Sequence, residues 1–423
     1  MIETREQLTS ALTAAAELEH GLLLQYLFAA YSLEKWPSEA ANITPARADR
    51  CRMWERAVLH IARDEMVHLG MVCNLLSAIG EAPQFRRPNF PRFVPLPPTP
   101  PSRPQSASAS ASGNAHAAPP APPPFRFELT AYSADTLGRF SRAESPELSA
   151  LLPPPPGELV PGDDPVLFDY TGQLYREIKD GFANIVVQLG EDGLFIGPRF
   201  AQDTSGWSNN FHIPNVTNGT SAAETIDMII AQGEGTSRTD PPSHYHTFER
   251  LRRELDQGGF NPARPVASNP RVHRGIRGVE DGTTILDPMT LEIARLHNEV
   301  YQTVLLMLMQ YYSFSGETPA QLDVLRDAIR TMMSMAIRPL AEILTLRPIG
   351  DGSGRTAGPC FEIVTDLRLS TQRENRWTIL DERLRAHVTS TRRIGAWIEE
   401  LPRLSFIAGS LTGIAGNVRS AAS

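Results

Sequence analysis

The stretches EHGLLLQY (residues 19–26) and EMVH (residues 65–68) decide how this chain folds, because each places polar side chains inside an apolar helical pattern. Glu65 and His68 are three residues apart, so on a helix both side chains leave the same face. Glu19 and Tyr26 are seven residues apart, which is two turns along one helix face. A carboxylate inside an apolar core is costly unless it is paired or bound to a cation. The two stretches therefore indicate a buried polar site between two helices.

Both stretches lie in long helical patterns. Apolar residues recur at helical spacing over residues 4–34, and again over residues 46–80, where Gly80 ends the pattern. Two long helices joined by a short loop predict an antiparallel pair, which is half of a four-helix bundle. We therefore expect an all-α fold, a four-helix bundle with additional helices and long irregular loops. The later helices are expected at residues 165–191, 221–232, from 242 onward, 288–313 and 319–346, with a last helix within 350–400.

Composition suggests how the chain is divided. Residues 95–124 consist mainly of Pro, Ser and Ala, a composition that cannot bury much apolar surface. We expect a metal-binding bundle over residues 1–260 with this stretch as a disordered insert. Residues 261–423 would form a second helical layer on the bundle, followed by a C-terminal tail that docks through residues 404–414. Residues 125–165 look irregular apart from a strand at 125–130, and a second short strand is expected at 360–365.

Bulk composition excludes several classes of protein. The 423 residues are 41% hydrophobic, and the net charge of −8 comes without a basic patch, so we expect no nucleic-acid partner. No run is long enough to span a bilayer and the N-terminus has no signal-peptide core, so we expect no membrane partner. Three cysteines indicate a reducing, cytoplasmic location. A small molecule is the expected partner, and a homodimer is one possible assembly.

A two-metal site in a helical bundle needs about four carboxylates and two imidazoles. Glu19, Glu65 and His68 supply three ligands, and later segments must supply the others. The candidates are Glu177, Glu224, Glu234, His244, His246 and Glu249.

Three of these candidates stand out. Glu234 lies between two glycines, which let the backbone approach a ligand closely. Residues two apart do not share a helix face, so at most one of His244 and His246 points inward, and we favour His244. Glu177 lies in the middle of a helix and is either a ligand or a surface charge. Tyr26 is either a core tyrosine or a catalytic phenol beside the metals.

Four stretches resemble a known family. ELEHGLLLQYLFAAYSL, IARDEMVHLGMVCNLLSAIGEAP, QGEGTS with SHYHTFERL, and TAGPCFEI are similar to the ferritin-like family found at the N-terminus of iminophenyl-pyruvate dimer synthases of violacein-type pathways. The resemblance runs from about residue 5 to residue 390, except for the Pro/Ser/Ala-rich insert.

The resemblance implies a ferritin-like bundle that binds two iron ions, or an iron and manganese pair. Glu19, Glu65 and His68 match ligand positions of the first helix pair, while Glu234 and His244 match the QGEG and SHY stretches. The last bundle helix lacks a second Glu-x-x-His motif, which leaves open a weakly held second metal or a single ion.

The activity that the resemblance implies is that of a non-haem di-iron oxidase or oxygenase. Such an enzyme uses dioxygen on a small organic substrate in secondary metabolism. One alternative is oxidative dimerisation of an amino-acid-derived imine. Another is a metal-binding or scaffold protein without turnover.

Overall fold

The structure, a computed structural model, describes residues 2–36, 44–93, 126–145, 171–204, 213–233, 242–273, 282–398 and 402–422. The expected all-α class is confirmed, because helices make up nearly all the regular structure in these ranges. The insert expected at 95–124 lies outside the described residues.

Two long helices form the centre of the molecule. α1 (Arg5–Tyr31) begins at a capping box in which Thr4 and Gln7 each accept a backbone hydrogen bond from the other residue. α2 (Pro45–Ala78) begins after Thr44, whose side chain accepts from the backbone of Arg47. Every residue of α1 from Glu19 to its end is buried. A helix that is buried all round has other elements packed on more than one side.

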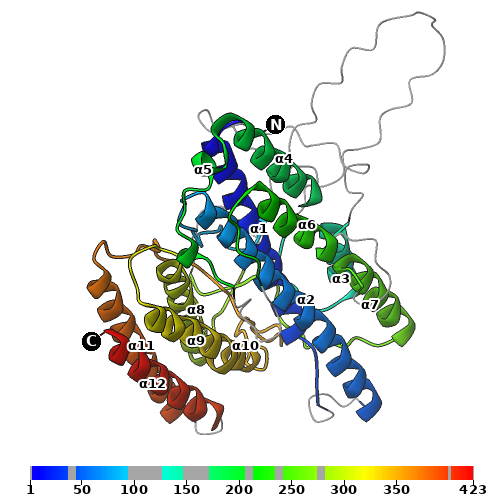
Figure 1. Ribbon diagram of the computed structural model, residues 1–423. Helices are drawn as coiled ribbons and strands as arrows, with labels where there is room; N and C mark the ends of the chain where they lie inside the picture. Colours follow the sequence, from blue (N-terminus) through cyan, green and yellow to red (C-terminus); the bar gives the residue numbers. More distant parts are fainter. Residues whose placement is uncertain are drawn as a thin grey trace, which may run out of the picture.

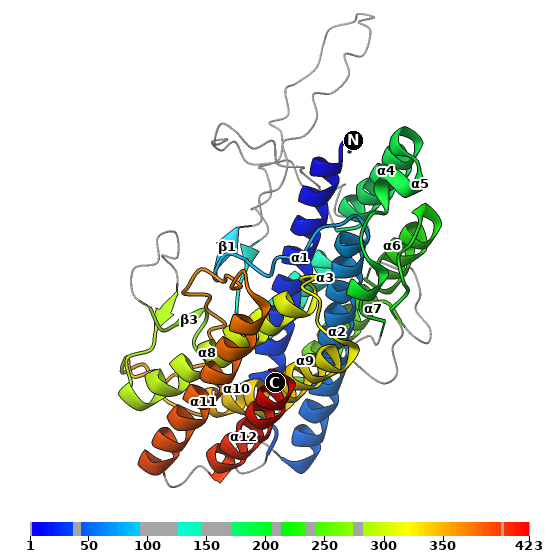
Figure 2. The ribbon, with the colours of Figure 1, turned by 60° about the vertical axis from the view of Figure 1, so that its left-hand side comes forward.

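The remaining helices cover two sides of this pair (Figures 1 and 2). One side carries α3 (Ala134–Ala143), α4 (Thr171–Leu189), α5 (Glu191–Leu194), η2 (Arg199–Ala201), α6 (Gly219–Gly233) and α7 (His244–Gly258). The other side carries α8 (Pro288–Tyr311), α9 (Pro319–Met332), η3 (Met333–Ile337) and α10 (Arg338–Leu344), with α11 (Arg373–Trp397) and α12 (Pro402–Ala422) outermost. The central pair thus separates two helical layers.

Four two-residue strands complete the described part. β1 (Arg92–Phe93) pairs antiparallel with β2 (Arg126–Phe127), and β3 (Pro270–Arg271) pairs parallel with β4 (Thr283–Thr284). β2 falls within the expected strand at 125–130.

Three expectations about single elements differ from the structure. α3 occupies a stretch expected to be irregular; Ser133 caps it, and Leu137 and Phe140 are buried from it. Residues 360–365 form no strand, because side chains of other segments rather than a neighbouring strand bind their backbone. The expected tail at 404–414 is part of α12, a full helix that packs on α11.

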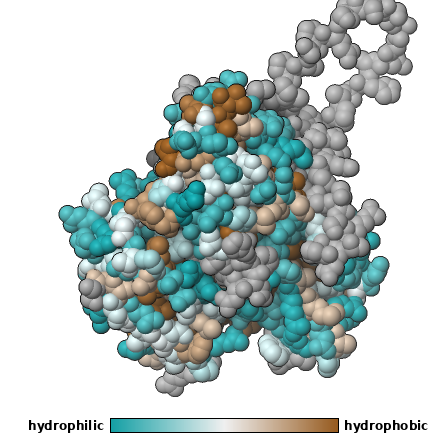
Figure 3. Space-filling view, in the orientation of Figure 1, coloured by the Kyte–Doolittle hydropathy of each residue, from teal (hydrophilic) through white to brown (hydrophobic). Residues whose placement is uncertain are grey.

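The described residues on the face shown in Figure 3 are largely polar. On the face shown in Figure 3, hydrophobic residues gather mainly at the end of the molecule where α4 and α5 lie, and Val187 and Ile196 are exposed there. None of the described helices is long and apolar enough to cross a membrane.

Candidate metal centre

Four helices bring five acidic and imidazole side chains together on one side of α1 and α2. Glu19 comes from α1, Glu65 and His68 from α2, Glu144 from the end of α3, and His244 from the first residue of α7. They form two overlapping groups, Glu19 with Glu65 and His68, and Glu65 with Glu144 and His244. Within each group the ligand atoms lie within 4.8 Å of one another, and all five residues are buried. Glu65 belongs to both groups.

The carboxylate of Glu65 faces both histidines. Its Oε2 lies 3.2 Å from Nδ1 of His68, and its Oε1 lies 2.8 Å from Nδ1 of His244. One carboxylate therefore presents a separate oxygen to each group. If metal ions were bound here, Glu65 would be the ligand that belongs to both groups.

Both histidines are oriented in the same way. Each presents Nδ1 to the cluster, while its Nε2 faces an oxygen of another side chain. For His68 that oxygen is Oε1 of Gln232, which accepts a hydrogen bond of 2.8 Å. For His244 it is Oδ2 of Asp64 at 3.5 Å. An acceptor behind the imidazole places the proton on Nε2 and leaves the lone pair of Nδ1 for a metal.

Three buried atoms of the cluster have no hydrogen-bond partner among the residues that the structure describes: Glu19 Oε2, Glu65 Oε1 and His244 Nδ1. The last two are 2.8 Å apart, yet they lack the alignment of a hydrogen bond. Unsatisfied buried polar atoms are costly, and they are rare unless something else binds them. Carboxylate oxygens and imidazole nitrogens are the usual ligands of iron and manganese. The residues present therefore fit a metal pair.

Two buried tyrosines donate hydrogen bonds to the carboxylates. The hydroxyl of Tyr26 donates to Oε1 of Glu144, and the hydroxyl of Tyr175, from α4, donates to Oε1 of Glu19. Burial and the nearby carboxylates raise the pKa of both phenols well above the ordinary value. Both tyrosines therefore keep their protons at neutral pH and hold one oxygen of each carboxylate in place.

The protein groups alone shift the protonation of the cluster. Burial raises the pKa of Glu19 to about 8, and the Glu65 carboxylate adds to this shift. Burial lowers the pKa of His68, but Glu65 and Glu19 outweigh it and raise that pKa to about 10. Burial likewise acts against the charged form of His244, and Glu65 raises its pKa well above the ordinary value. Burial acts to raise the pKa of Glu65, and the histidines lower it well below the ordinary value. Without a cation, Glu19, His68 and His244 therefore carry protons at neutral pH, and these protons offset the negative charge of the buried carboxylates.

The structure brings together four of the predicted ligands, Glu19, Glu65, His68 and His244. Glu177 is half-buried and belongs to neither group. It is two residues from Tyr175, which faces the cluster, so the two side chains leave α4 about 200° apart. Glu234 lies outside the described residues.

Sequence reasoning missed Glu144, because it follows a helix that the pattern did not reveal. The pattern also did not single out Tyr175 and Gln232, which bond to Glu19 and His68 of the cluster. A usable signal for Tyr175 was its place in the apolar stripe of the helix expected at 165–191, where it could face the bundle interior.

The fold and the cluster together define a helical-bundle protein with a buried carboxylate and histidine centre. More narrowly, the chain belongs to the ferritin-like family, whose model matches residues 12–253. The matched region contains all five residues of the cluster.

Two curated relatives are similar over most of this chain. Dichlorochromopyrrolate synthase from Lentzea aerocolonigenes is 28% identical over 86% of this chain and 36% of its own length. The 2-imino-3-(indol-3-yl)propanoate dimerase from Chromobacterium violaceum is 27% identical over 87% of this chain and 35% of its own length. The chain therefore spans about a third of the length of these relatives. A solved ferritin-like protein from Caulobacter vibrioides aligns with 78% of this chain and 95% of its own at 17% identity, with a TM-score of 0.48.

Proposed function

We propose that this protein is a metal-dependent oxidoreductase that uses dioxygen to oxidise a small organic molecule. The proposed cofactor is a pair of iron ions, or iron and manganese, held by Glu19, Glu65, His68, Glu144 and His244. The observation that carries the proposal is Glu65, whose two oxygens face two different buried histidines.

A metal pair of this kind, when bound, supplies the activation of dioxygen that organic side chains cannot provide. The protein's own groups set the conditions. Glu19 and His68 would hold one ion, Glu144 and His244 the other, and Glu65 would contribute one oxygen to each. Apolar residues of α1 and α6, among them Leu22 and Ile229, line the small cavity beside the cluster.

The two tyrosines would orient the ligands and keep protons close. Tyr26 holds Glu144 and Tyr175 holds Glu19, and each phenol carries its proton next to a carboxylate. A proton held at that position can be given to a reacting oxygen and regained from solvent. We propose Tyr26 as such a proton donor.

Metal analysis of the purified protein tests the proposal. The wild-type chain should hold about two ions. His68→Ala should lose about one, and Glu65→Ala nearly both, because Glu65 faces both groups. Glu177→Ala is the matched control and should keep both, since Glu177 belongs to neither group. Full occupancy in Glu65→Ala would refute the ligand assignment.

A narrower reaction is suggested by the two relatives, a synthase and a dimerase by name. We propose oxidative dimerisation of an amino-acid-derived imine as the second candidate. Joining two such molecules by one new carbon–carbon bond removes two electrons and two protons, which dioxygen would accept as hydrogen peroxide. Supplying the imine in situ with an amino-acid oxidase and following the product by mass spectrometry tests this candidate. A loaded protein that neither consumes dioxygen nor changes any imine would instead favour metal binding without turnover.

A further inference from the structure

A second cavity lies on the other side of the central helix pair. It holds about 770 Å³ of empty space, including its open mouth, between α1 and α2 on one side and α8, α9 and η3 on the other. No residue that lines this cavity also lines the small cavity beside the metal cluster.

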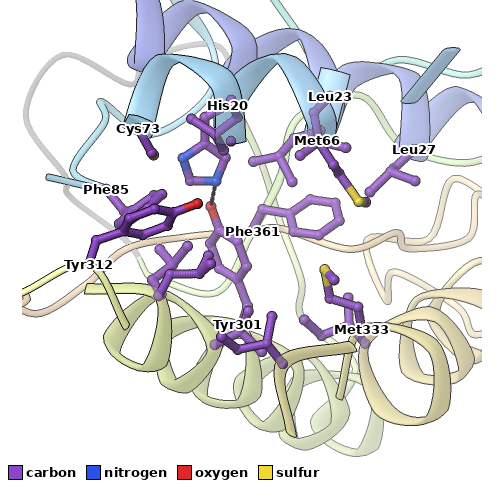
Figure 4. A pocket seen from close by; sticks show the side chains of 18 of the residues that line it. His20, Leu23, Leu27, Met66, Cys73, Phe85, Tyr301, Tyr312, Met333 and Phe361 are labelled. Atoms are coloured by element: carbon purple, nitrogen blue, oxygen red, sulfur yellow. Dashed lines mark hydrogen bonds between the residues drawn. The ribbon is translucent and has the colours of Figure 1, made fainter. Parts of the chain in front are cut away.

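The walls of this cavity are apolar and rich in flat or polarisable side chains. Figure 4 shows Met66 and Met333 on opposite walls, with the rings of Phe85 and Phe361 between the helices. Methionine sulfurs make favourable contacts with aromatic rings. The chemistry of the walls therefore favours an aromatic body over a polar one.

One end of the cavity is polar. The hydroxyl of Tyr301 lies 2.7 Å from Nε2 of His20, the bond dashed in Figure 4. Behind Tyr301, Nε of Arg87 donates to the same hydroxyl at 3.2 Å. An oxygen acceptor entering here would meet a hydroxyl that Arg87 polarises.

Arg87 is a buried cation that lacks a counter-ion among the described residues. Its side chain is 6% exposed, and its other hydrogen bonds go to the backbone oxygens of Pro88 and Phe361. No carboxylate of the described residues lies within ion-pair distance of it. A buried charge without an opposite charge is costly, and a bound anion would remove that cost. The positive charge at this end thus complements a carboxylate.

Two local irregularities also border the cavity. η3 is a π-helical turn, and its residues Met333 and Ile337 line the cavity. π-helical turns are rare in proteins overall, and those that occur are often found at functional sites. Phe361 has φ of 50°, which is unusual for a bulky residue, and hydrogen bonds from Arg87 to its carbonyl and from the backbone of Glu362 to Asn298 hold it there. Strained backbone conformations that the surroundings hold in place are concentrated at ligand-binding sites.

We propose that this cavity binds an aromatic carboxylic acid, with its ring between Met66 and Met333 and its carboxylate at the hydroxyl of Tyr301. The site is separate from the metal centre, so the ligand binds whether or not metal is present.

Calorimetric titration of the full chain, in the presence of a chelator, tests this site with naphthylacetate and with the neutral naphthylethanol. The acid should bind about tenfold more tightly than the alcohol, since a hydrogen bond to a charged group is the stronger one. Tyr301→Phe should lower the affinity for the acid about tenfold, so that the acid and the alcohol bind with nearly equal affinity. Leu308→Trp should abolish the binding of both ligands, because Leu308 lines the cavity and the larger tryptophan ring would fill it.

Leu291→Trp is the matched control for the filling variant. Leu291 is also a half-buried leucine of α8 but does not line the cavity, so this variant should bind like the wild type. A crystal soaked with bromonaphthylacetate locates the ligand independently of any variant, with the bromine signal expected between Met66 and Met333. The proposal is overturned if the wild type binds neither ligand at millimolar concentration, or if the bromine lies elsewhere. An acid and an alcohol that bind equally would overturn the assignment of the carboxylate to Tyr301.

Discussion

His68 and His244 show at the residue scale how the candidate centre is organised. Their Nδ1 atoms face the same carboxylate, and a different neighbour stands behind each ring, Gln232 in one case and Asp64 in the other. Such outer partners fix the tautomer and the orientation of an imidazole ligand. The affinity for metal should therefore depend on residues that touch no ion.

Gln232→Leu should lower the affinity of one metal site by about 10- to 100-fold, as is typical when the partner of a ligand histidine is removed. The other site should be unaffected, since Asp64 still faces His244. Competition with a calibrated chelator measures both affinities. Gln188→Leu, at an exposed position of α4, is the control. Equal affinities in Gln232→Leu and the wild type would show that His68 needs no such partner.

Tyr26→Phe should lower the free energy of unfolding by about 1–3 kcal/mol, because Glu144 loses a donated hydrogen bond in a buried site. Tyr132→Phe is the matched control, since Tyr132 is equally buried and its hydroxyl has no hydrogen-bond partner within the described part of the chain. Denaturant unfolding of both variants gives the comparison. A metal-loaded Tyr26→Phe protein that retains its metal but turns over more slowly would support a proton-donor role. An equal loss of stability in both variants would contradict the importance of this bond.

The sequence predicts part of the cluster because helix periodicity fixes which side chains share a face. It does not tell which face becomes the site. Glu17 and His20 have the same spacing as Glu65 and His68, yet Glu17 pairs with Arg92 and His20 bonds Tyr301. Glu144 is far from the other ligands in sequence, and only the packing of α3 against α7 brings it to them. Such contacts between distant segments have no local signal.

At the scale of elements, α1 serves two sites from one helix. Glu19 faces the metal cluster and the next residue, His20, faces the second cavity, because successive residues leave a helix about 100° apart. β2 crosses α1 close to Gly21, where an added Cβ would lie 2.5 Å from the ring of Phe127. A side chain larger than hydrogen at this position would push β2 away from α1.

Gly21→Ala should destabilise the protein by about 1–3 kcal/mol, the usual cost of overpacking a core. Gly413→Ala should do the opposite and stabilise by about 0.5–1 kcal/mol, since this glycine of α12 has nothing within 4 Å of an added Cβ. Thermal unfolding of the two variants should show shifts of opposite sign. A stable Gly21→Ala protein would mean that Phe127 moves aside at little cost.

Long helices could be predicted where an apolar stripe continues over many turns, as in α1, α2 and α8. α3 was missed because it is short and is followed by residues rich in proline. α12 was read as a tail, although Leu404, Ile407, Leu411, Ile414 and Val418 follow helical spacing. The glycines of α12 lower its helix propensity, so the sequence did not predict a helix there in spite of that spacing. The π-helical turn after Met332 gave no signal, since the apolar pattern continues through it.

At the scale of the whole molecule, the central pair α1 and α2 lies between the two proposed sites. The metal cluster lies toward α3, α4, α6 and α7, and the second cavity lies toward α8 and α9. The chain passes from one side to the other between α7 and α8, close to the boundary at residues 260 and 261 that composition suggested. We retain that boundary as a proposal. A ligand in one cavity can affect the other site only through the helices that both share.

The stability of the whole protein without metal should fall as pH rises from about 6 to about 9. The pKa of Glu19 is raised to about 8 in the fold, so its contribution is complete below its unfolded value near 4.5 and is lost as pH passes 8. The pKa of His68 is raised to about 10, so its contribution is lost over a higher range in the same direction. Glu65 acts in the opposite sense, but only at acidic pH, where its lowered pKa lies.

Melting temperatures of the chelator-treated protein across this range test that expectation. Glu19→Gln should make the fall shallower, because the glutamine amide carries no titrating proton and only the part that His68 contributes is left. Glu177→Gln should keep the wild-type slope. Bound metal should remove the fall altogether, since cations then take the place of the protons and bind more tightly as pH rises. A metal-free wild type that becomes more stable between pH 6 and 9 would show that protons do not hold these buried carboxylates together.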